Sequence, residues 1–184
     1  MLNRDYSEML CALSEAKVKF ILVGGYALAV HGYPYTTTLD IDFWVFASPE
    51  NARAVIRALK RFGAPLMGVT EADFEKEGTF FQIEVVPRRM NIITKIDGVS
   101  FAEAYSRALV TEWEGVTVHV LSLQDLLANK RATGRLKDLA DVELLERLLT
   151  PKSEPTPDAL PGKARKKAAP RNARNNTRRG CGEG

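Results

Sequence analysis

Two aspartates, Asp40 and Asp42, are separated by a single isoleucine. In an extended strand, residues two apart point to the same side, so these carboxylates would lie next to each other. Adjacent carboxylates repel each other unless a proton or a cation lies between them. Mg²⁺ takes oxygen ligands and keeps positions open for phosphates. The spacing therefore indicates a divalent metal site, and the alternative is a solvated strand face.

A glycine pair, Gly24-Gly25, precedes the aspartates and follows the short apolar stretch 20–23. Because glycine has no Cβ, the backbone can approach a ligand closely, and the N–H groups at a helix start can face phosphate. A glycine pair alone can also be an ordinary turn between a strand and a helix. In this order, with a short helix between them, the glycines and aspartates indicate a site for metal and phosphate.

The elements that must position these residues alternate along the chain. Hydrophobic periodicity predicts helices at about 6–13, 26–31, 49–62, 100–108, 122–134 and 137–149. It predicts strands at 20–23, 39–46, 79–86, 90–96, 110–113 and 116–121. The mixture favours an α+β domain with a mixed sheet. Trp44 and Phe46 share the aspartate face, and we expect them to pack under a neighbouring helix; the alternative is stacking on a base.

The ends of three helices carry capping signals. We expect Ser48 to cap the helix at 49–62 and Gly63 to end it. Ser100 with Glu103 predicts a capping box, and Ser122 is expected to cap the helix that follows it.

The overall composition excludes several classes of protein. The 184 residues are 45% hydrophobic and include two cysteines and two histidines, too few for a disulfide framework or a zinc centre. The longest apolar runs, such as 43–47, are too short to cross a bilayer, and the first residues lack a signal-peptide stretch. We therefore expect a cytoplasmic protein with no membrane partner.

The positive charge is concentrated at the end of the chain. Residues 151–184 carry nine Lys/Arg and three Asp/Glu, whereas the whole chain has a net charge of +3. Few large apolar residues occur there, so we expect a domain at 1–150 and a disordered basic tail at 151–184. The tail would either attract polyanions or act only as a solubilising terminus.

A longer pattern extends these motifs. It consists of Gly24-Gly25, His31-Gly32, Thr38, Asp40-Ile41-Asp42, and the stretches 81–83, 91–94, 96–101, 129–135 and 137–141. The pattern resembles minimal nucleotidyltransferases of the DNA polymerase β superfamily, and specifically AbiEii-type proteins associated with toxin–antitoxin pairs. The resemblance covers residues from about 17 to 145.

The resemblance implies a polymerase β-type nucleotidyltransferase fold with flanking helices. It assigns metal binding (Mg²⁺ or Mn²⁺) and catalysis to Asp40 and Asp42. It assigns nucleotide binding to Gly24, Gly25, Thr38, Lys130 and Lys137. For the two lysines, the alternative is a solvated helix surface.

Two positions depart from the family pattern. The catalytic position at Asn91 usually holds a third aspartate, and asparagine has neither the charge nor the ability to accept a proton. Thr36 stands where relatives commonly carry arginine. Glu84, on the preceding strand, could replace the missing carboxylate if it faced the cleft, and the alternative is a surface residue. We therefore expect metal and nucleotide binding to survive better than transfer.

These features lead to three functional hypotheses. The first is Mg²⁺-dependent transfer of a nucleoside monophosphate from an NTP to a hydroxyl of RNA, protein or a small molecule, in a toxin–antitoxin system. The second is a catalytically degenerate member of the fold that binds a nucleotide or a partner protein of a two-component system. The third is a nucleic-acid-binding protein that acts through its basic tail.

Overall fold

The structure, a computed structural model, describes residues 3–33 and 39–149, with the side chains of Lys137, Leu144 and Leu148 excepted. Its strands are β1 (Phe20–Val23), β2 (Asp40–Val45), β3 (Phe80–Val85), β4 (Arg88–Ile93), β5 (Leu109–Trp113) and β6 (Val116–Val120). Its helices are α1 (Arg4–Glu15), α2 (Gly24–Val30), α3 (Pro49–Phe62), α4 (Glu71–Phe74), α5 (Phe101–Arg107), α6 (Leu123–Thr133) and α7 (Leu136–Leu149).

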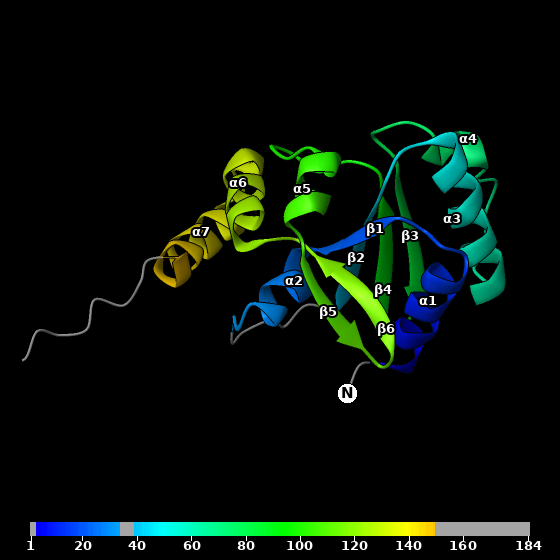
Figure 1. Cartoon of the computed structure of the whole chain (residues 1–184), viewed down its shortest axis with the longest axis horizontal. Helices are drawn as coiled ribbons and strands as arrows, with labels where there is room; N and C mark the ends of the chain where they lie inside the picture. Colours follow the sequence, from blue (N-terminus) through cyan, green and yellow to red (C-terminus); the bar gives the residue numbers. More distant parts are fainter. Residues whose placement is uncertain (1–2, 34–38, 150–184) are drawn as a thin grey trace, which may run out of the picture. The chain divides into compact units, whose positions relative to one another are not determined.

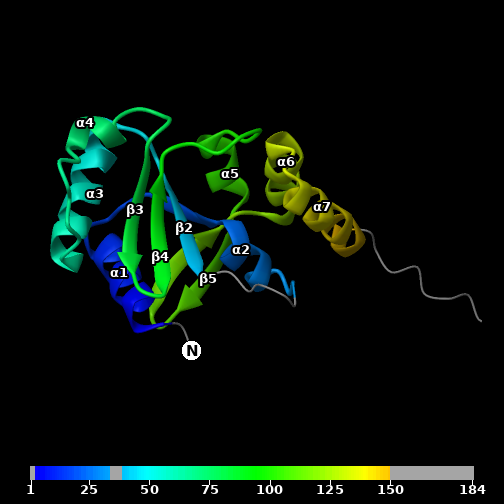
Figure 2. The ribbon, with the colours of Figure 1, turned by 180° about the vertical axis from the view of Figure 1, so that it is seen from behind.

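The strands form one mixed sheet in the order β3-β4-β2-β1-β6-β5 (Figure 1). Neighbours β2 and β4 are parallel, as are β1 and β6, whereas the other three pairs are antiparallel. Figure 2 shows β3, β4 and β2 side by side. The predicted α+β architecture with a mixed sheet is confirmed.

The alternation along β2 divides the sheet into two faces. Ile41, Phe43 and Val45 are fully buried on one face. On that face lies α4, whose Phe74 meets the β3 side chain Phe81 edge to face. Figures 1 and 2 show α1, α3 and α4 gathered at one side of the sheet, and α5, α6 and α7 at the other. The opposite face of β2 is therefore left for Asp40 and Asp42.

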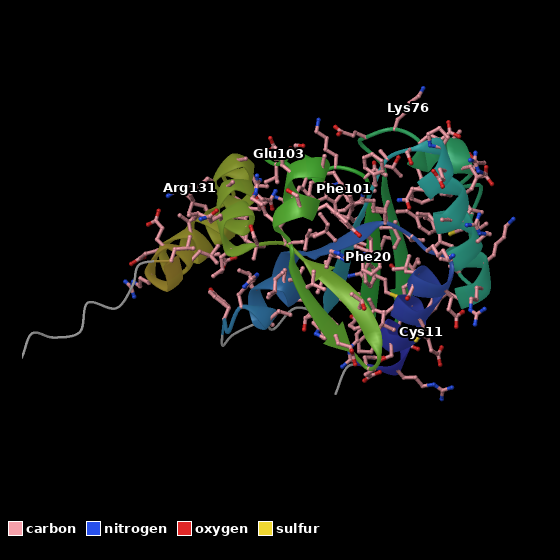
Figure 3. The ribbon with its side chains drawn as sticks, in the orientation of Figure 1. Cys11, Phe20, Lys76, Phe101, Glu103 and Arg131 are labelled. Carbon is pink, nitrogen blue, oxygen red and sulfur yellow. The ribbon has the colours of Figure 1, made fainter. Side chains whose placement is uncertain are left out.

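Helix α5 covers part of the aspartate face. Phe101, labelled in Figure 3, belongs to this helix. Its ring lies 4.9 Å from that of Trp44 and 5.1 Å from that of Phe46, measured between ring centroids. The expected packing of Trp44 and Phe46 under a helix is confirmed. Beyond this aromatic contact, the same face of β2 carries the carboxylates of Asp42 and Asp40.

The capping predictions succeed at two helices and fail at one. The side chain of Ser48 accepts a hydrogen bond from the Asn51 amide, and Gly63 ends α3 with a φ of +82°. Ser122 caps α6 as expected. The box predicted at Ser100 is wrong, because its side chain makes no capping hydrogen bond. The sequence interpretation also missed α4.

The start of β4 differs from the prediction in a way that affects the site. The sequence placed Arg88 and Arg89 in a turn before a strand at 90–96, but both belong to β4. In the register of β4 with β2, Arg89 is opposite Asp40 and Asn91 is opposite Asp42. Two cross-strand pairs therefore stand where the metal site was predicted.

Some expectations concern residues outside the described part of the chain. These are Thr36, Thr38 and the basic segment 151–184. Among the helices of the described residues, none is long and apolar enough to cross a membrane.

Candidate active site

A cleft of about 550 Å³ opens on the aspartate face of the sheet. Helices α2, α6 and α7 and strands β2, β3 and β4 all contribute side chains to it. The predicted residues Gly24, Gly25, Asp40, Asp42, Asn91 and Lys130 all line this cleft. The structure thus brings together residues that are more than 100 positions apart in the sequence.

Asp42 and Asn91 form the centre of the cleft. The Nδ2 group of Asn91 donates a hydrogen bond of 2.7 Å to Oδ1 of Asp42. Asn91 is only 6% exposed, and its own Oδ1 atom is buried without a hydrogen-bond partner. A buried polar oxygen without a partner is costly, and such an atom often marks a position for a ligand or ion.

Gly24 lies next to Oδ2 of Asp42, the oxygen that Asn91 does not bind. A Cβ atom added to Gly24 would lie 2.2 Å from Oδ2 of Asp42. Gly24 also has a φ of +67°, a conformation that residues with a side chain rarely adopt. Only glycine therefore permits the Asp42 carboxylate to lie against the start of α2.

The environment of Asp42 raises its pKa. Burial is the largest cause, and the nearby charge of Asp40 acts in the same direction. The hydrogen bond from Asn91 and the charge of Lys130 act against this rise without cancelling it. The carboxylate therefore lies in a position where a cation would stabilise its ionised form.

Asp40 has a different partner, which the sequence interpretation missed. Arg89 donates from Nε to Oδ1 of Asp40 at 2.8 Å and from Nη2 to Oδ2 at 3.1 Å. Such a bidentate pair is among the strong hydrogen-bonded contacts of proteins. To identify Arg89 from the sequence, the strand predicted at 90–96 would have to begin at least one residue earlier and pair in parallel with β2.

Glu84 does not take the place of the missing third carboxylate. It is exposed on the edge strand β3 and lies opposite Arg89 in the β3–β4 register. It therefore shares a sheet face with Asp40, but Arg89 lies between the two acids. Glu84 is thus a surface residue, the alternative considered from the sequence, and it is not among the residues that line the cleft.

Lys130 is the centre of a second charged cluster in the cleft. Its Nζ atom lies 2.5 Å from Asp138 and 2.7 Å from Asp141. Tyr33 donates to Asp141 and Thr133 donates to Asp138, so both carboxylates have additional partners. Lys130 is 13% exposed, which excludes the solvated helix surface considered from the sequence.

The pKa values in this cluster reflect competition between burial and pairing. Burial alone would lower the pKa of Lys130, but hydrogen bonds and charge from the two aspartates raise it above its usual value. Burial would raise the pKa of Asp138, but Lys130 and Thr133 lower it below its usual value. Both groups are therefore held in their charged forms.

Neither His31 nor His119 is among the residues that line the cleft. Lys137 belongs to α7, and its side chain is outside the described part. His31 ends α2, with Nε2 2.8 Å from the carbonyl oxygen of Leu121, so it joins α2 to the segment after β6. His119 stacks on the ring of Tyr105, with the ring centroids 4.3 Å apart.

Comparison with protein families identifies the class of protein. Residues 3–150 match the model of a family described as nucleotidyltransferase of unknown function (DUF6036). The chain belongs to this nucleotidyltransferase family. The match covers every described residue of the cleft.

Solved structures share the fold of this nucleotidyltransferase. The crystal structure of TM1012, a candidate nucleotidyltransferase from Thermotoga maritima, has a TM-score of 0.51 and 18% identity, and the match covers 81% of this chain and 95% of that one. The solution structure of the antibiotic-resistance factor ANT(2'')-Ia has a TM-score of 0.50 and 17% identity, with coverage of 79% and 83%. Identities this low support the fold alone. No curated protein matches the chain.

The donor set of the nucleotidyltransferase cleft can be compared with the needs of a divalent metal. Within residues 3–33 and 39–149, no group of three or more His, Cys, Asp and Glu side chains could hold a metal ion. Asp40 and Asp42 supply only two carboxylates, but the buried Oδ1 of Asn91 is a further oxygen without a partner. The donor types, two carboxylates and one amide oxygen, are those that a hard cation such as Mg²⁺ prefers, with one negative charge fewer than three carboxylates would give.

Proposed function

We propose that this protein transfers a nucleoside monophosphate from an NTP to a hydroxyl group in a metal-dependent reaction. The arrangement of Gly24, Asp42 and Asn91 is the observation that supports this proposal most strongly. Gly24 lies against one oxygen of Asp42, and Asn91 binds the other, so the carboxylate is fixed at the base of the cleft. Membership of a nucleotidyltransferase family makes an NTP the natural ligand of such a cleft.

Asp40, Asp42 and the amide oxygen of Asn91 are the groups that would hold Mg²⁺ or Mn²⁺. When bound, the ion would supply Lewis-acid stabilisation of charge on the phosphate oxygens. The protein's part is to keep these oxygens close together. Gly24 does so by leaving room for Asp42, and β4 does so by holding Asn91 in register with it.

The residues on the two sides of Asp40 and Asp42, toward α2 and toward β4, suggest different roles. Gly24 and Gly25 at the start of α2, together with Lys130 of α6, lie on the side away from β4, and we assign them to the triphosphate. Thr38 and Lys137 keep the same assignment on the resemblance alone. An in-line displacement places the attacking hydroxyl opposite the leaving pyrophosphate. The acceptor would then enter from the side of β3 and β4.

That acceptor side contains an exposed aromatic ring. Phe80 is 62% exposed and lines the cleft together with Ile93 and Ile96. An exposed ring beside aliphatic side chains suits an acceptor with a flat apolar group next to its hydroxyl, such as a nucleobase or a tyrosine side chain. RNA and protein acceptors both meet this description.

A transfer assay tests the proposal. The purified chain is incubated with each α-labelled NTP, Mg²⁺, and total cellular RNA or protein. We expect label to appear in the acceptor and to fall about 10²–10³-fold in Asp42→Asn. We expect Asn91→Asp to raise the rate at least about tenfold, because it restores a group that can accept a proton.

A matched control for the transfer assay is Asp5→Asn in α1, which changes the same kind of side chain at a residue that does not line the cleft. It should transfer label as the wild type does. Equal labelling by the wild type and Asp42→Asn would refute the assignment of the cleft.

A second candidate function is nucleotide binding without transfer. The observation that favours it is that Asn91 and Arg89 already satisfy oxygens of Asp42 and Asp40. A protein of this kind could act as a binding partner in a two-component system, as the resemblance to AbiEii-type toxin–antitoxin proteins suggests. Calorimetry that detects binding of NTP with Mg²⁺, combined with no transfer by the wild type or Asn91→Asp, would select this function.

A further inference from the structure

Arg89 donates hydrogen bonds to both carboxylate oxygens of Asp40, a residue that the proposed function makes a metal ligand. Its guanidinium group bonds to Oδ1 and Oδ2 of Asp40 at 2.8 and 3.1 Å. The Asp40 side chain is 29% exposed, whereas that of Arg89 is 51% exposed. The cation therefore reaches Asp40 from the solvent side and could leave without disturbing the core.

The two carboxylates of the site are paired with groups of different charge. Asp42 receives a neutral amide from Asn91, whereas Asp40 receives a full positive charge from Arg89. A divalent ion bound to Asp40 would lie close to this guanidinium group, and like charges at such distances repel each other strongly. Metal binding and the Asp40–Arg89 pair are therefore in competition.

A second acid lies on the other side of Arg89. In the sheet register, Arg89 on β4 is opposite Asp40 on β2 and also opposite Glu84 on β3. Side chains directly opposite each other on neighbouring strands share a face and lie within contact distance. A guanidinium group displaced from Asp40 thus has a carboxylate within reach on the neighbouring strand.

We propose that Arg89 is a two-position counter-ion that pairs with Asp40 when metal is absent and with Glu84 when a divalent metal binds Asp40. This inference rests on the proposed function, because it requires that the carboxylates bind metal. It gives Glu84 a role that differs from metal ligation, since Glu84 receives the displaced cation. According to this proposal, two exposed residues, Arg89 and Glu84, determine the metal affinity of a more buried site.

Mn²⁺ binding to the full chain tests the inference without any transfer reaction. Free Mn²⁺ is measured by electron paramagnetic resonance during a titration, in the absence of nucleotide. Arg89→Ala should bind Mn²⁺ roughly 3- to 30-fold more tightly than the wild type, because the competing cation is gone. Glu84→Gln should bind it roughly 2- to 5-fold more weakly, because the displaced cation has no second partner.

The double variant and a neighbouring arginine sharpen the test. Arg89→Ala/Glu84→Gln should bind Mn²⁺ nearly as tightly as Arg89→Ala, because Glu84 acts through Arg89. Arg88→Ala is the matched control, because Arg88 precedes Arg89 on the same strand and lies near Tyr6 of α1. It removes the same charge from the chain and should leave the affinity within about twofold of the wild type.

Three results would overturn the inference. They are equal tightening by Arg88→Ala and Arg89→Ala, unchanged affinity in Glu84→Gln, and no Mn²⁺ binding in any of the variants. Asp42→Asn should abolish the binding, which assigns the signal to this cleft. The variants could show the expected changes in Mn²⁺ affinity while the protein transfers no nucleotide. That result would contradict the proposed reaction but not the counter-ion role of Arg89.

Discussion

Replacement of Gly24 by alanine should destabilise the protein in two ways, through a steric contact with Asp42 and through backbone strain. The added Cβ would lie 2.2 Å from Oδ2 of Asp42, so the carboxylate must move. That movement breaks the 2.7 Å hydrogen bond from Asn91, which costs about 1.5–3 kcal/mol for a charged partner. The positive φ of Gly24 adds about 1–2 kcal/mol of backbone strain. The expected loss is therefore about 2.5–5 kcal/mol.

Gly63→Ala separates these two contributions. Gly63 has a φ of +82°, but an added Cβ would have nothing within 4 Å, so only the strain of about 1–2 kcal/mol applies. Urea unfolding at pH 7 gives the free energy for each variant. In an Asp42→Ala background, Gly24→Ala should cost no more than Gly63→Ala. Equal costs of Gly24→Ala with and without Asp42 would refute the reasoning.

Two further predictions concern polar groups away from the metal position. The folded state lowers the pKa of Asp138, so this residue contributes stability above its ordinary pKa of 3.8, and the contribution is lost as the pH falls through the lower folded value. In urea unfolding, the destabilisation by Asp138→Asn should therefore be largest near pH 7 and should decrease as the pH falls below 3.8, and a loss that does not change with pH would contradict this origin. Asn51 is buried and bonds to the backbone N and O of Lys19 and to the O of Phe46 at 2.7, 3.0 and 2.8 Å. Asn51→Ala should cost about 2–4 kcal/mol, and a loss below about 1 kcal/mol would show that water replaces these bonds.

The parts of the fold that depend on neighbouring residues could be predicted from the sequence. Helix α3 follows from the Ser48 cap, the apolar stripe and the Gly63 stop, all of which act within one helix. The pairing of Asp40 and Asp42 on one face follows from the two-residue period of a strand. The box at Ser100 was predicted from the same kind of signal and did not form, because a capping residue type does not ensure the bond.

The partners of the site residues could not be predicted, because they depend on strand register. Arg89 meets Asp40 only through the parallel pairing of β2 and β4, across 49 positions of sequence. A strand start set two residues too late removed Arg89 from consideration. The cluster around Lys130 depends on how α6 and α7 pack together, which the charge pattern of either helix does not show.

The central claim is that Asp40 and Asp42 form a metal and nucleotide site. A crystal structure of the full chain with Mn²⁺ and a non-hydrolysable NTP analogue tests it most directly. We predict an anomalous peak at the Asp42 carboxylate, with the triphosphate beside Gly24 and Gly25. An ordered nucleotide elsewhere on the protein, or Mn²⁺ bound away from both aspartates, would contradict the claim.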